Sequence, residues 1–228
     1  LSDEAVLVVT MEYPVTYPRF IDRFLVTSEA YDIPAALVFN KVDLYSDEAL
    51  SDLAFYTRVY LDAGYQVLHT SATEKLGLED FAELLKDKTS LLSGHSGVGK
   101  STLINRVQPD LDIKTAEISQ SHDQGQHTTT FAEMYDLSIG GSIVDTPGIR
   151  GFGLVDMSKE EIGDYFPEIF ELKSGCRFTN CLHLNEPGCA VKQAVEEHRF
   201  AFTRYESYLS FITGDSEDEP YRTVNYTE

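Results

Sequence analysis

A glycine-rich segment in the middle of the chain constrains the fold more than any other feature. The apolar run Thr89–Leu92 leads into Gly94-His95-Ser96-Gly97-Val98-Gly99-Lys100-Ser101, with Thr102 next in a helical pattern. G-x-x-x-x-G-K-S between a strand and a helix predicts a loop whose backbone N–H groups surround phosphate oxygens. The helix directs its positive end at the same oxygens. We expect Lys100 to reach the β- and γ-phosphates and the Ser101 hydroxyl to bind Mg²⁺.

Strand-like apolar runs alternate with helical patterns up to about residue 150. The expected strands are Ala5–Thr10, Ala35–Phe39, Gln66–Thr70, Thr89–Leu92, Ala132–Asp136 and Ser142–Val144. The expected helices between them are Phe20–Tyr31, Asp47–Ala63, Gly77–Leu85 and Lys100–Val107. This alternation predicts an α/β fold with a mostly parallel sheet covered on both faces. Its ligand site should lie beyond the carboxyl ends of the strands.

Two further motifs follow expected strands. Asp145-Thr146-Pro147-Gly148 resembles the D-x-x-G of GTPases, in which the aspartate holds Mg²⁺ through water and the glycine N–H senses the γ-phosphate. Asn40-Lys41-Val42-Asp43 resembles their N-K-x-D, where a carboxylate accepts two hydrogen bonds from guanine. Adenine lacks that pair of donors, and a carboxylate left unpaired costs about 1–3 kcal/mol. The motifs therefore predict GTP and GDP as ligands rather than ATP.

Asn40 is expected to brace the loop near the base, and the stem of Lys41 to cover the ring. Ser71 and Ala72, after the next strand, offer backbone N–H groups to guanine O6. The order of the motifs is permuted, because the base motifs precede the phosphate loop. Chain ends commonly lie close together, so a permuted chain can keep the same sheet. The D-x-x-G segment then leads directly into the rest of the chain, which predicts that nucleotide state controls how the following domain is posed.

Hydrolysis needs a group that orients the attacking water, and Ile149 stands where small GTPases often carry a glutamine. The run Gly125-Gln126-His127-Thr128-Thr129-Thr130 lies between the phosphate loop and D-x-x-G. We expect Thr129 to reach Mg²⁺ together with Ser101 and Asp145. His127 is the candidate water-positioning residue. With Lys100, these two residues make up the predicted catalytic set.

The three cysteines lie in one short segment, Cys176-x4-Cys181-x-His183-x5-Cys189. Three thiolates and one imidazole make a full tetrahedral set for one structural zinc ion, with no position left for water. Such clustering indicates metal binding in a reducing compartment rather than a disulfide framework. We expect domains at 1–152 and 153–228, the second mainly helical, with helices at Ser158–Tyr165 and Ala190–Ile212.

The second of these helical patterns carries aromatic residues and two arginines, namely Arg199, Phe200, Phe202, Arg204, Tyr205, Tyr208 and Phe211. Such a stripe either stacks on RNA bases or packs within its own domain, and packing is the commoner case. The net charge of −20 argues against broad, sequence-independent nucleic-acid binding. No apolar run approaches the roughly 20 residues that cross a bilayer, so no membrane partner is expected.

A permuted set of GTPase motifs leading into Cys-x4-Cys-x-His-x5-Cys resembles the RsgA (YjeQ) family, the bacterial small-ribosomal-subunit biogenesis GTPases. The resemblance covers nearly the whole chain. It implies a GTP hydrolase, with Mg²⁺ and one Zn²⁺, that acts late in small-subunit maturation. It further implies a cytoplasmic protein that binds the small ribosomal subunit and its rRNA, and we expect a monomer. Family members carry an N-terminal OB-fold domain, which we do not expect within these 228 residues, because they enter the sheet at Ala5–Thr10.

Three alternatives remain open from the residues. One is a permuted GTPase that acts on the large subunit, against which the complete zinc set argues. Another is a P-loop ATPase. The third is a zinc-stabilised RNA-binding module that uses GTP only as a structural ligand. GTP turnover with and without small ribosomal subunits separates the last from an enzyme.

Overall fold

The computed structural model describes residues 2–111, 133–145 and 157–214. Its six-stranded sheet has the order β3-β2-β1-β4-β6-β5. The strands are β1 (Glu4–Val9), β2 (Ala35–Phe39), β3 (Gln66–His69), β4 (Thr89–Ser93), β5 (Glu133–Asp136) and β6 (Ser142–Asp145). All neighbours pair in parallel except β5, which runs antiparallel to β6 at the edge. The predicted, mostly parallel α/β sheet is confirmed.

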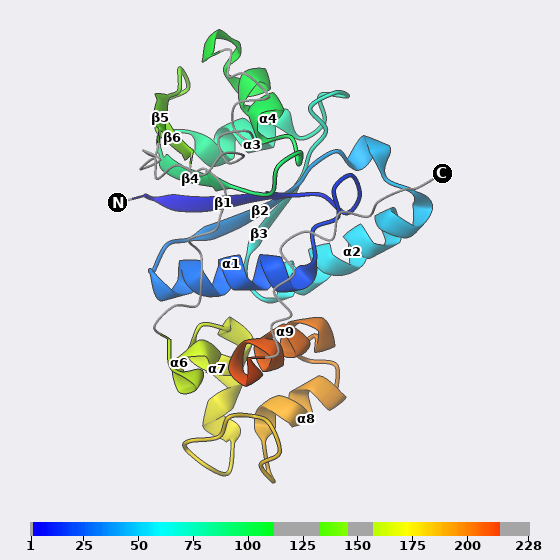
Figure 1. The fold of residues 1–228 in the computed structure, drawn as a ribbon, viewed down its shortest axis with the longest axis vertical. Helices are drawn as coiled ribbons and strands as arrows, with labels where there is room; N and C mark the ends of the chain where they lie inside the picture. Colours follow the sequence, from blue (N-terminus) through cyan, green and yellow to red (C-terminus); the bar gives the residue numbers. More distant parts are fainter. Residues whose placement is uncertain (1, 112–132, 146–156, 215–228) are drawn as a thin grey trace, which may run out of the picture.

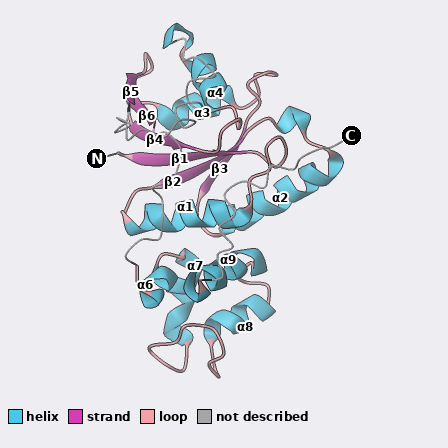
Figure 2. Ribbon diagram, in the orientation of Figure 1, coloured by secondary structure: helices cyan, strands magenta, loops and turns pink. Residues whose placement is uncertain are grey.

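Helices cover both faces of this sheet (Figures 1 and 2). The side chains of β1 alternate, so Val6 and Val8 face one core, whereas Leu7 and Val9 face the other. One face packs against α1 (Pro18–Ala30) and α2 (Asp47–Asp62). The other packs against α3 (Leu78–Leu85) and α4 (Lys100–Val107). Two 3₁₀ turns, η1 (Val42–Leu44) and η2 (Pro109–Leu111), follow β2 and α4.

A helical unit lies beside α1, on the side away from the sheet (Figure 1). It consists of α6 (Lys159–Asp164), α7 (Pro167–Leu172), η3 (Lys173–Gly175), α8 (Ala190–Glu196), α9 (Phe202–Thr213) and the loops between them. A capping box between Ser158 and Glu161 begins α6, and a proline in the first turn begins α7. No helix in the three described ranges is both long and apolar enough to span a bilayer.

The single helix expected over Ala190–Ile212 is wrong, because the chain breaks it into α8 and α9. His198 adopts a left-handed conformation, φ 56°, and the backbone N–H groups of Arg199 and Phe200 both donate to the carbonyl of Ala194. This turn buries Phe200 and redirects α9 toward α1. Helix α7 was also not expected, although Pro167 at its first turn is a helix-start signal.

The aromatic stripe packs within the protein. Phe200, Tyr205 and Tyr208 are buried in one apolar cluster with residues of α6, α7 and α8. Val26 of α1 belongs to the same cluster, so the helical unit shares its core with the outer side of α1. Phe202 and Arg199 are exceptions, since their side chains are exposed. The packing interpretation of the stripe therefore holds for its buried members.

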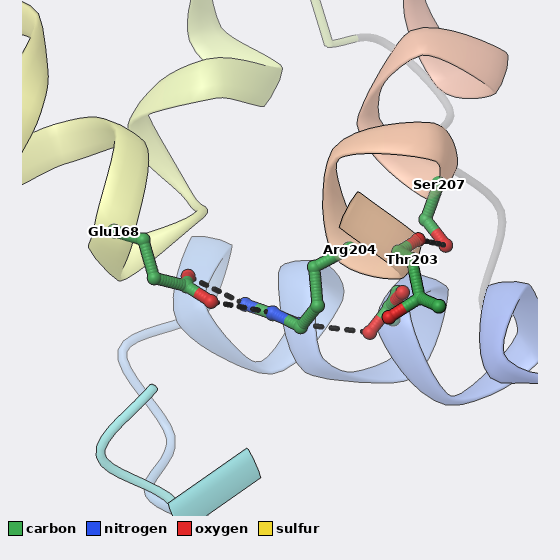
Figure 3. A network of polar contacts seen from close by, with 5 residues as sticks. Glu168, Thr203, Arg204 and Ser207 are labelled. Carbon is green, nitrogen blue, oxygen red and sulfur yellow. Dashed lines mark hydrogen bonds and ion pairs between the residues drawn. The ribbon is translucent and has the colours of Figure 1, made fainter. Parts of the chain in front are cut away.

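A buried arginine joins the helical unit to α1 (Figure 3). Arg204 of α9 donates from Nη1 to Asp22 Oδ1 of α1 at 2.8 Å. Its Nε and Nη2 donate to the two carboxylate oxygens of Glu168 in α7, at 2.7 and 2.8 Å. The side chains of Arg204 and Asp22 are 1% and 0% exposed. Removing Arg204 would leave the buried carboxylate of Asp22 without an opposite charge, whereas removing Asp22 would leave Arg204 paired with Glu168.

Candidate functional site

The motif-bearing loops meet at one edge of the sheet. Strands β1, β2, β3, β4 and β6 are parallel, so their carboxyl ends point the same way. Asn40 follows β2, Ser71 lies two residues past β3, and Gly94 follows β4. In the register of the sheet, Asp145 at the end of β6 pairs with Leu92. The placement agrees with the rule that ligands of parallel sheets bind beyond the strand ends.

The phosphate loop depends on glycine at three positions with positive φ, Gly94 (146°), Gly97 (85°) and Gly99 (95°). A Cβ on Gly94 would lie 2.2 Å from the carbonyl oxygen of Val8, so no other residue fits there without displacing β1. Gly99 ends the loop and α4 begins at Lys100. The resulting turn brings backbone N–H groups and a helix N-terminus to one point, as an anion site requires.

Lys100 lies inside this loop. Its Nζ donates to the carbonyl oxygens of Gly94 at 2.6 Å and His95 at 3.1 Å, and the residue is buried. Ser101, the expected magnesium ligand, is buried at the start of the same helix. The ammonium group is therefore held inside the glycine loop, and a bound phosphate would replace its carbonyl contacts by anionic ones.

Asn40 connects the N-K-x-D loop to the phosphate loop. Its Nδ2 donates to the carbonyl oxygen of Val98 at 2.8 Å, and its Oδ1 accepts a hydrogen bond from Thr70 Oγ1 at 3.0 Å. The residue is 1% exposed, so both bonds are shielded from water. Three loops, after β2, β3 and β4, are thereby fixed to one another by a single side chain.

Lys41 and Asp43 stand on the rim of the same site. Lys41 has a left-handed backbone, φ 62°, and its Nζ donates to the carbonyl oxygen of Tyr13 at 2.8 Å. Burial lowers the pKa of Lys41, and the charge of Asp43 opposes that shift. Asp43 itself is exposed in η1, with Val42 before it. Its carboxylate is accessible to a ligand that offers two donors, as guanine does.

The loop after β3 carries Ser71 and Ala72, whose backbone N–H groups are the expected donors to guanine O6. The backbone N–H of Ser71 donates to the carbonyl oxygen of Leu76, and Ser71 Oγ accepts from the backbone of Glu74. Ser71 is thus engaged in its own turn and is fully buried. Ala72, also buried, is left as the candidate that donates its N–H to guanine O6.

Four expected site residues lie wholly or partly outside the described residues. His127, Thr129 and Gly148 fall in the undescribed ranges, so their roles stay predictions. For Asp145 only the backbone is described, at the end of β6. The proposed domain boundary at 152–153 also lies outside the described residues.

The segment between β1 and α1 contacts the site and was missed by motif reasoning. The hydroxyl of Thr10 donates to the carbonyl oxygen of Pro14, and the backbone N–H of Thr16 donates to that of Thr10 at 2.9 Å. This folds the segment over the phosphate loop, where the Pro14 ring would lie 3.6 Å from a Cβ on Gly97. Its position in the sequence does indicate this contact, because the segment follows β1, and β1 ends at the same sheet edge as the strands that precede the motifs.

A second candidate site lies in the helical unit. Cys176, Cys181, His183 and Cys189 bring one ligand atom each to within 4.8 Å of one another. The shorter separations are 3.4 Å for His183 Nδ1 to Cys189 Sγ, 3.6 Å for Cys176 Sγ to His183 Nδ1, and 4.0 Å for Cys176 Sγ to Cys189 Sγ. Tetrahedral zinc with Zn–S of about 2.3 Å and Zn–N of about 2.0 Å requires separations of about 3.5–3.8 Å. The four residues fit a metal ion of that geometry.

Surrounding groups hold these ligands in place. Glu186 accepts hydrogen bonds from the backbone N–H groups of Leu182 and Leu184, both at 2.8 Å, on either side of His183. The hydroxyls of Tyr205 and Tyr208 donate to the carbonyl oxygens of His183 and Leu182. Such outer contacts orient metal ligands.

Burial disfavours the ionised form of two of the thiols, Cys181 and Cys189. Burial raises the pKa of the Cys181 thiol to about 12, and the neighbouring Cys189 and Cys176 add to the rise. Burial also raises the pKa of Cys189. It lowers the pKa of His183, which favours the neutral imidazole that binds metals. A bound metal ion would reverse the balance for the thiols, because it stabilises the thiolates directly.

Comparison with known proteins assigns the chain to a family. The model of the RsgA GTPase family matches residues 2–155, about two thirds of the 228-residue chain. This chain belongs to the RsgA GTPase family. It is 53% identical over 226 residues to a Flavobacterium psychrophilum protein named small ribosomal subunit biogenesis GTPase RsgA, covering 99% of this chain and 69% of that protein. A Bacteroides fragilis protein of the same name is 51% identical, with coverage of 97% and 71%.

Solved structures place this RsgA-family chain among permuted GTPases. A crystal structure of YjeQ from Thermotoga maritima superposes with a TM-score of 0.80 at 35% identity, covering 94% of this chain and 71% of that one. The structure of YloQ, described as a circularly permuted GTPase, gives a TM-score of 0.77 at 36% identity, with coverage of 96% and 70%. The expected permuted fold and family resemblance are confirmed.

Proposed function

We propose that this RsgA-family GTPase binds GTP with Mg²⁺, hydrolyses it, and assists late maturation of the small ribosomal subunit. The observation that carries the proposal is the hydrogen bond from Asn40 to Val98, which joins the guanine-type loop to the phosphate loop at one sheet edge. The names of its relatives, which cover nearly the whole chain, support the ribosomal role.

The residues divide the chemistry as follows. The backbone of Gly94–Gly99 and the Nζ of Lys100 bind the phosphates, and Asp43 selects guanine with Ala72. Bound magnesium neutralises charge on the phosphates, and Ser101, Thr129 and Asp145 would hold it. His127 orients the attacking water, since the residue after D-x-x-G is Ile149. Cys176, Cys181, His183 and Cys189 hold one structural zinc ion.

We further propose that the division falls at 1–152 and 153–228, and that nucleotide state, sensed at Asp145 and Gly148, governs binding to the ribosome and its rRNA. The protein would act in the cytoplasm as a monomer, without a membrane partner. The acidic net charge of −20 implies that rRNA contacts are confined to particular sites rather than spread over the surface.

GTP turnover measured with and without purified small ribosomal subunits tests the proposal. We expect slow intrinsic turnover that the subunits accelerate, and GDP but not ADP should raise the melting temperature. Lys100→Ala should abolish both the turnover accelerated by the subunits and the rise in melting temperature with GDP. Nucleotide binding without turnover under either condition would instead support an RNA-binding module that uses GTP as a structural ligand.

The role of His127 has its own test. His127→Ala should keep the affinity for GDP and for a non-hydrolysable GTP analogue, while turnover falls about 10²–10⁴-fold, the range typical of a lost acid–base or water-orienting group. His198→Asn is the matched control, because this histidine is exposed on the helical unit and asparagine tolerates its left-handed backbone. Unchanged turnover in His127→Ala would remove this residue from the mechanism.

A further inference from the structure

Helix α1 contacts the phosphate loop at its beginning. The ring of Phe20 stacks on the ring of His95, with centroids 3.9 Å apart and an interplanar angle of 29°. His95 is the second residue of the phosphate loop, and its carbonyl oxygen accepts a hydrogen bond from Lys100 Nζ at 3.1 Å. Any displacement of the first turn of α1 would therefore alter the surroundings of Lys100.

Two residues further along, the same helix is fastened to the helical unit. Asp22 is fully buried and binds Arg204, which Glu168 holds by two further hydrogen bonds (Figure 3). The guanidinium also lies 4.9 Å from the centre of the Phe166 ring. Since the side chains of Phe20 and Asp22 are engaged with different partners, α1 is held at its beginning by both contacts at once.

Helix α9 continues this series of contacts to the metal site. Arg204 is followed directly by Tyr205, whose hydroxyl bonds the carbonyl oxygen of His183, and one turn later Tyr208 bonds that of Leu182. The same short helix therefore binds α1 on one side and the metal-binding loop on the other. An unbroken set of contacts runs from the ligand loop of the helical unit to Lys100.

We propose that Arg204 is a positioning residue for nucleotide binding, which acts by fixing α1 through Asp22 and so holding Phe20 against His95. The helical unit then sets the nucleotide affinity of the phosphate loop, and bound nucleotide in turn stabilises the attachment of the unit, because such coupling is reciprocal. The inference rests on the proposed nucleotide site and adds to it a residue from a different part of the chain.

A double-mutant cycle on the full chain tests this coupling. The dissociation constant for GDP is measured by titration calorimetry for the wild type, Phe20→Leu, Arg204→Lys and the double variant. Each single change should weaken GDP binding about 2- to 25-fold, the range expected for residues that couple sites without touching the ligand. The double variant should lose clearly less than the product of the two single effects, because both act through one contact.

Two controls separate positioning from general damage. Phe20→Tyr keeps the stacked ring and should retain GDP affinity, and Glu206→Gln alters an exposed position of α9 and should do the same. Circular dichroism at the titration temperature verifies that each variant is folded. If Arg204→Lys fails to fold, Asp22→Asn tests the same link, since its amide still accepts a hydrogen bond from Arg204 but lacks the charge.

The inference is overturned if folded Arg204→Lys or Asp22→Asn keeps the wild-type affinity for GDP. It is also overturned if the fold loss of GDP affinity in the double variant equals the product of the two single losses. A wild-type protein that does not bind GDP would contradict the proposed function instead, so the two failures are distinguishable.

Discussion

The side-chain amide of Asn40 donates a hydrogen bond to the backbone carbonyl oxygen of Val98 across 2.8 Å, although 58 positions separate them in the sequence. Neither loop is therefore independent, because the first residue of the Asn40–Asp43 loop also fixes the shape of the phosphate loop. A ligand that spans base and phosphates would meet both loops already joined, which reduces the cost of ordering them on binding.

Asn40→Ala is expected to weaken both folding and nucleotide binding. It leaves the carbonyl of Val98 and the hydroxyl of Thr70 without their partner, which costs about 1–3 kcal/mol for each group that stays buried. Urea unfolding measures the stability loss and calorimetry the GDP affinity. Gln66→Ala, an exposed position on neighbouring β3, is the control that should leave both unchanged. A wild-type urea midpoint for Asn40→Ala would contradict the bracing role.

Gly99 and Gly64 form a matched pair for testing the phosphate loop. Their φ angles are 95° and 93°, in the left-handed region that favours glycine, so alanine is strained at both sites, by about 1–2 kcal/mol. A Cβ on Gly64 meets nothing within 4 Å, whereas one on Gly99 would lie 2.5 Å from Asn40 Nδ2. Gly99→Ala should therefore lose GDP binding in calorimetry, and Gly64→Ala should keep it. Equal GDP affinities in the two variants would show that the close approach to Asn40 is unimportant.

Glu186→Ala should weaken metal binding although Glu186 is not a ligand. Burial alone would raise the pKa of this carboxyl, but hydrogen bonds from the backbone of Leu182 and other N–H groups lower it overall, so the carboxylate is charged at neutral pH. Loss of the groups that orient metal ligands typically costs about 10- to 100-fold in affinity. Competition with a chromophoric chelator measures the change.

Glu196→Ala, an exposed carboxylate of α8, is the control for that measurement. Elemental analysis of the wild type should find one zinc per chain, and Cys189→Ser should lower this content. Full retention of metal by Glu186→Ala at wild-type affinity would mean that the loop holds His183 without help from the carboxylate.

Asp22→Ala is expected to destabilise the protein by about 1–3 kcal/mol, because the buried Nη1 of Arg204 loses its partner while Glu168 still compensates the charge of the guanidinium. Asp62→Ala breaks an ion pair to Arg58 whose side chains are 57% and 78% exposed, and should cost less than about 1 kcal/mol. Chemical unfolding followed by circular dichroism compares the two. Similar losses in the free energy of unfolding for both variants would mean that the buried ion pair of Asp22 stabilises the protein no more than the exposed pair of Asp62.

Local patterns were sufficient to predict the sheet, the loops at its edge and the metal ligands. Each motif follows a strand, and parallel strands bring their ends together whatever the order along the chain. The four candidate metal ligands lie within one short segment, so their convergence needs no long-range contact. That the backbone N–H of Ser71 bonds within its own turn could not be predicted, because this depends on a contact with Leu76.

No local sequence pattern predicts the contacts between α1 and the helical unit. Arg204 lies in an aromatic stripe that fits an RNA-binding surface as well as a core, and only docking onto α1 decides between them. The same is true of the stacking between Phe20 and His95, since neither residue belongs to a pattern that specifies its partner. The break between α8 and α9 follows from burying Phe200, which helical periodicity alone does not reveal.

The buried pair of Asp22 and Arg204 has a consequence for synthesis of the protein. The two residues are 182 positions apart, so at a synthesis rate of about 5–20 residues per second Arg204 is added to the chain roughly 9–36 s after Asp22. During that interval the outer side of α1, with Val26 on it, has no helical unit to cover it. A charged carboxylate beside Val26 keeps water on this side of the nascent helix and opposes premature apolar association until α9 arrives.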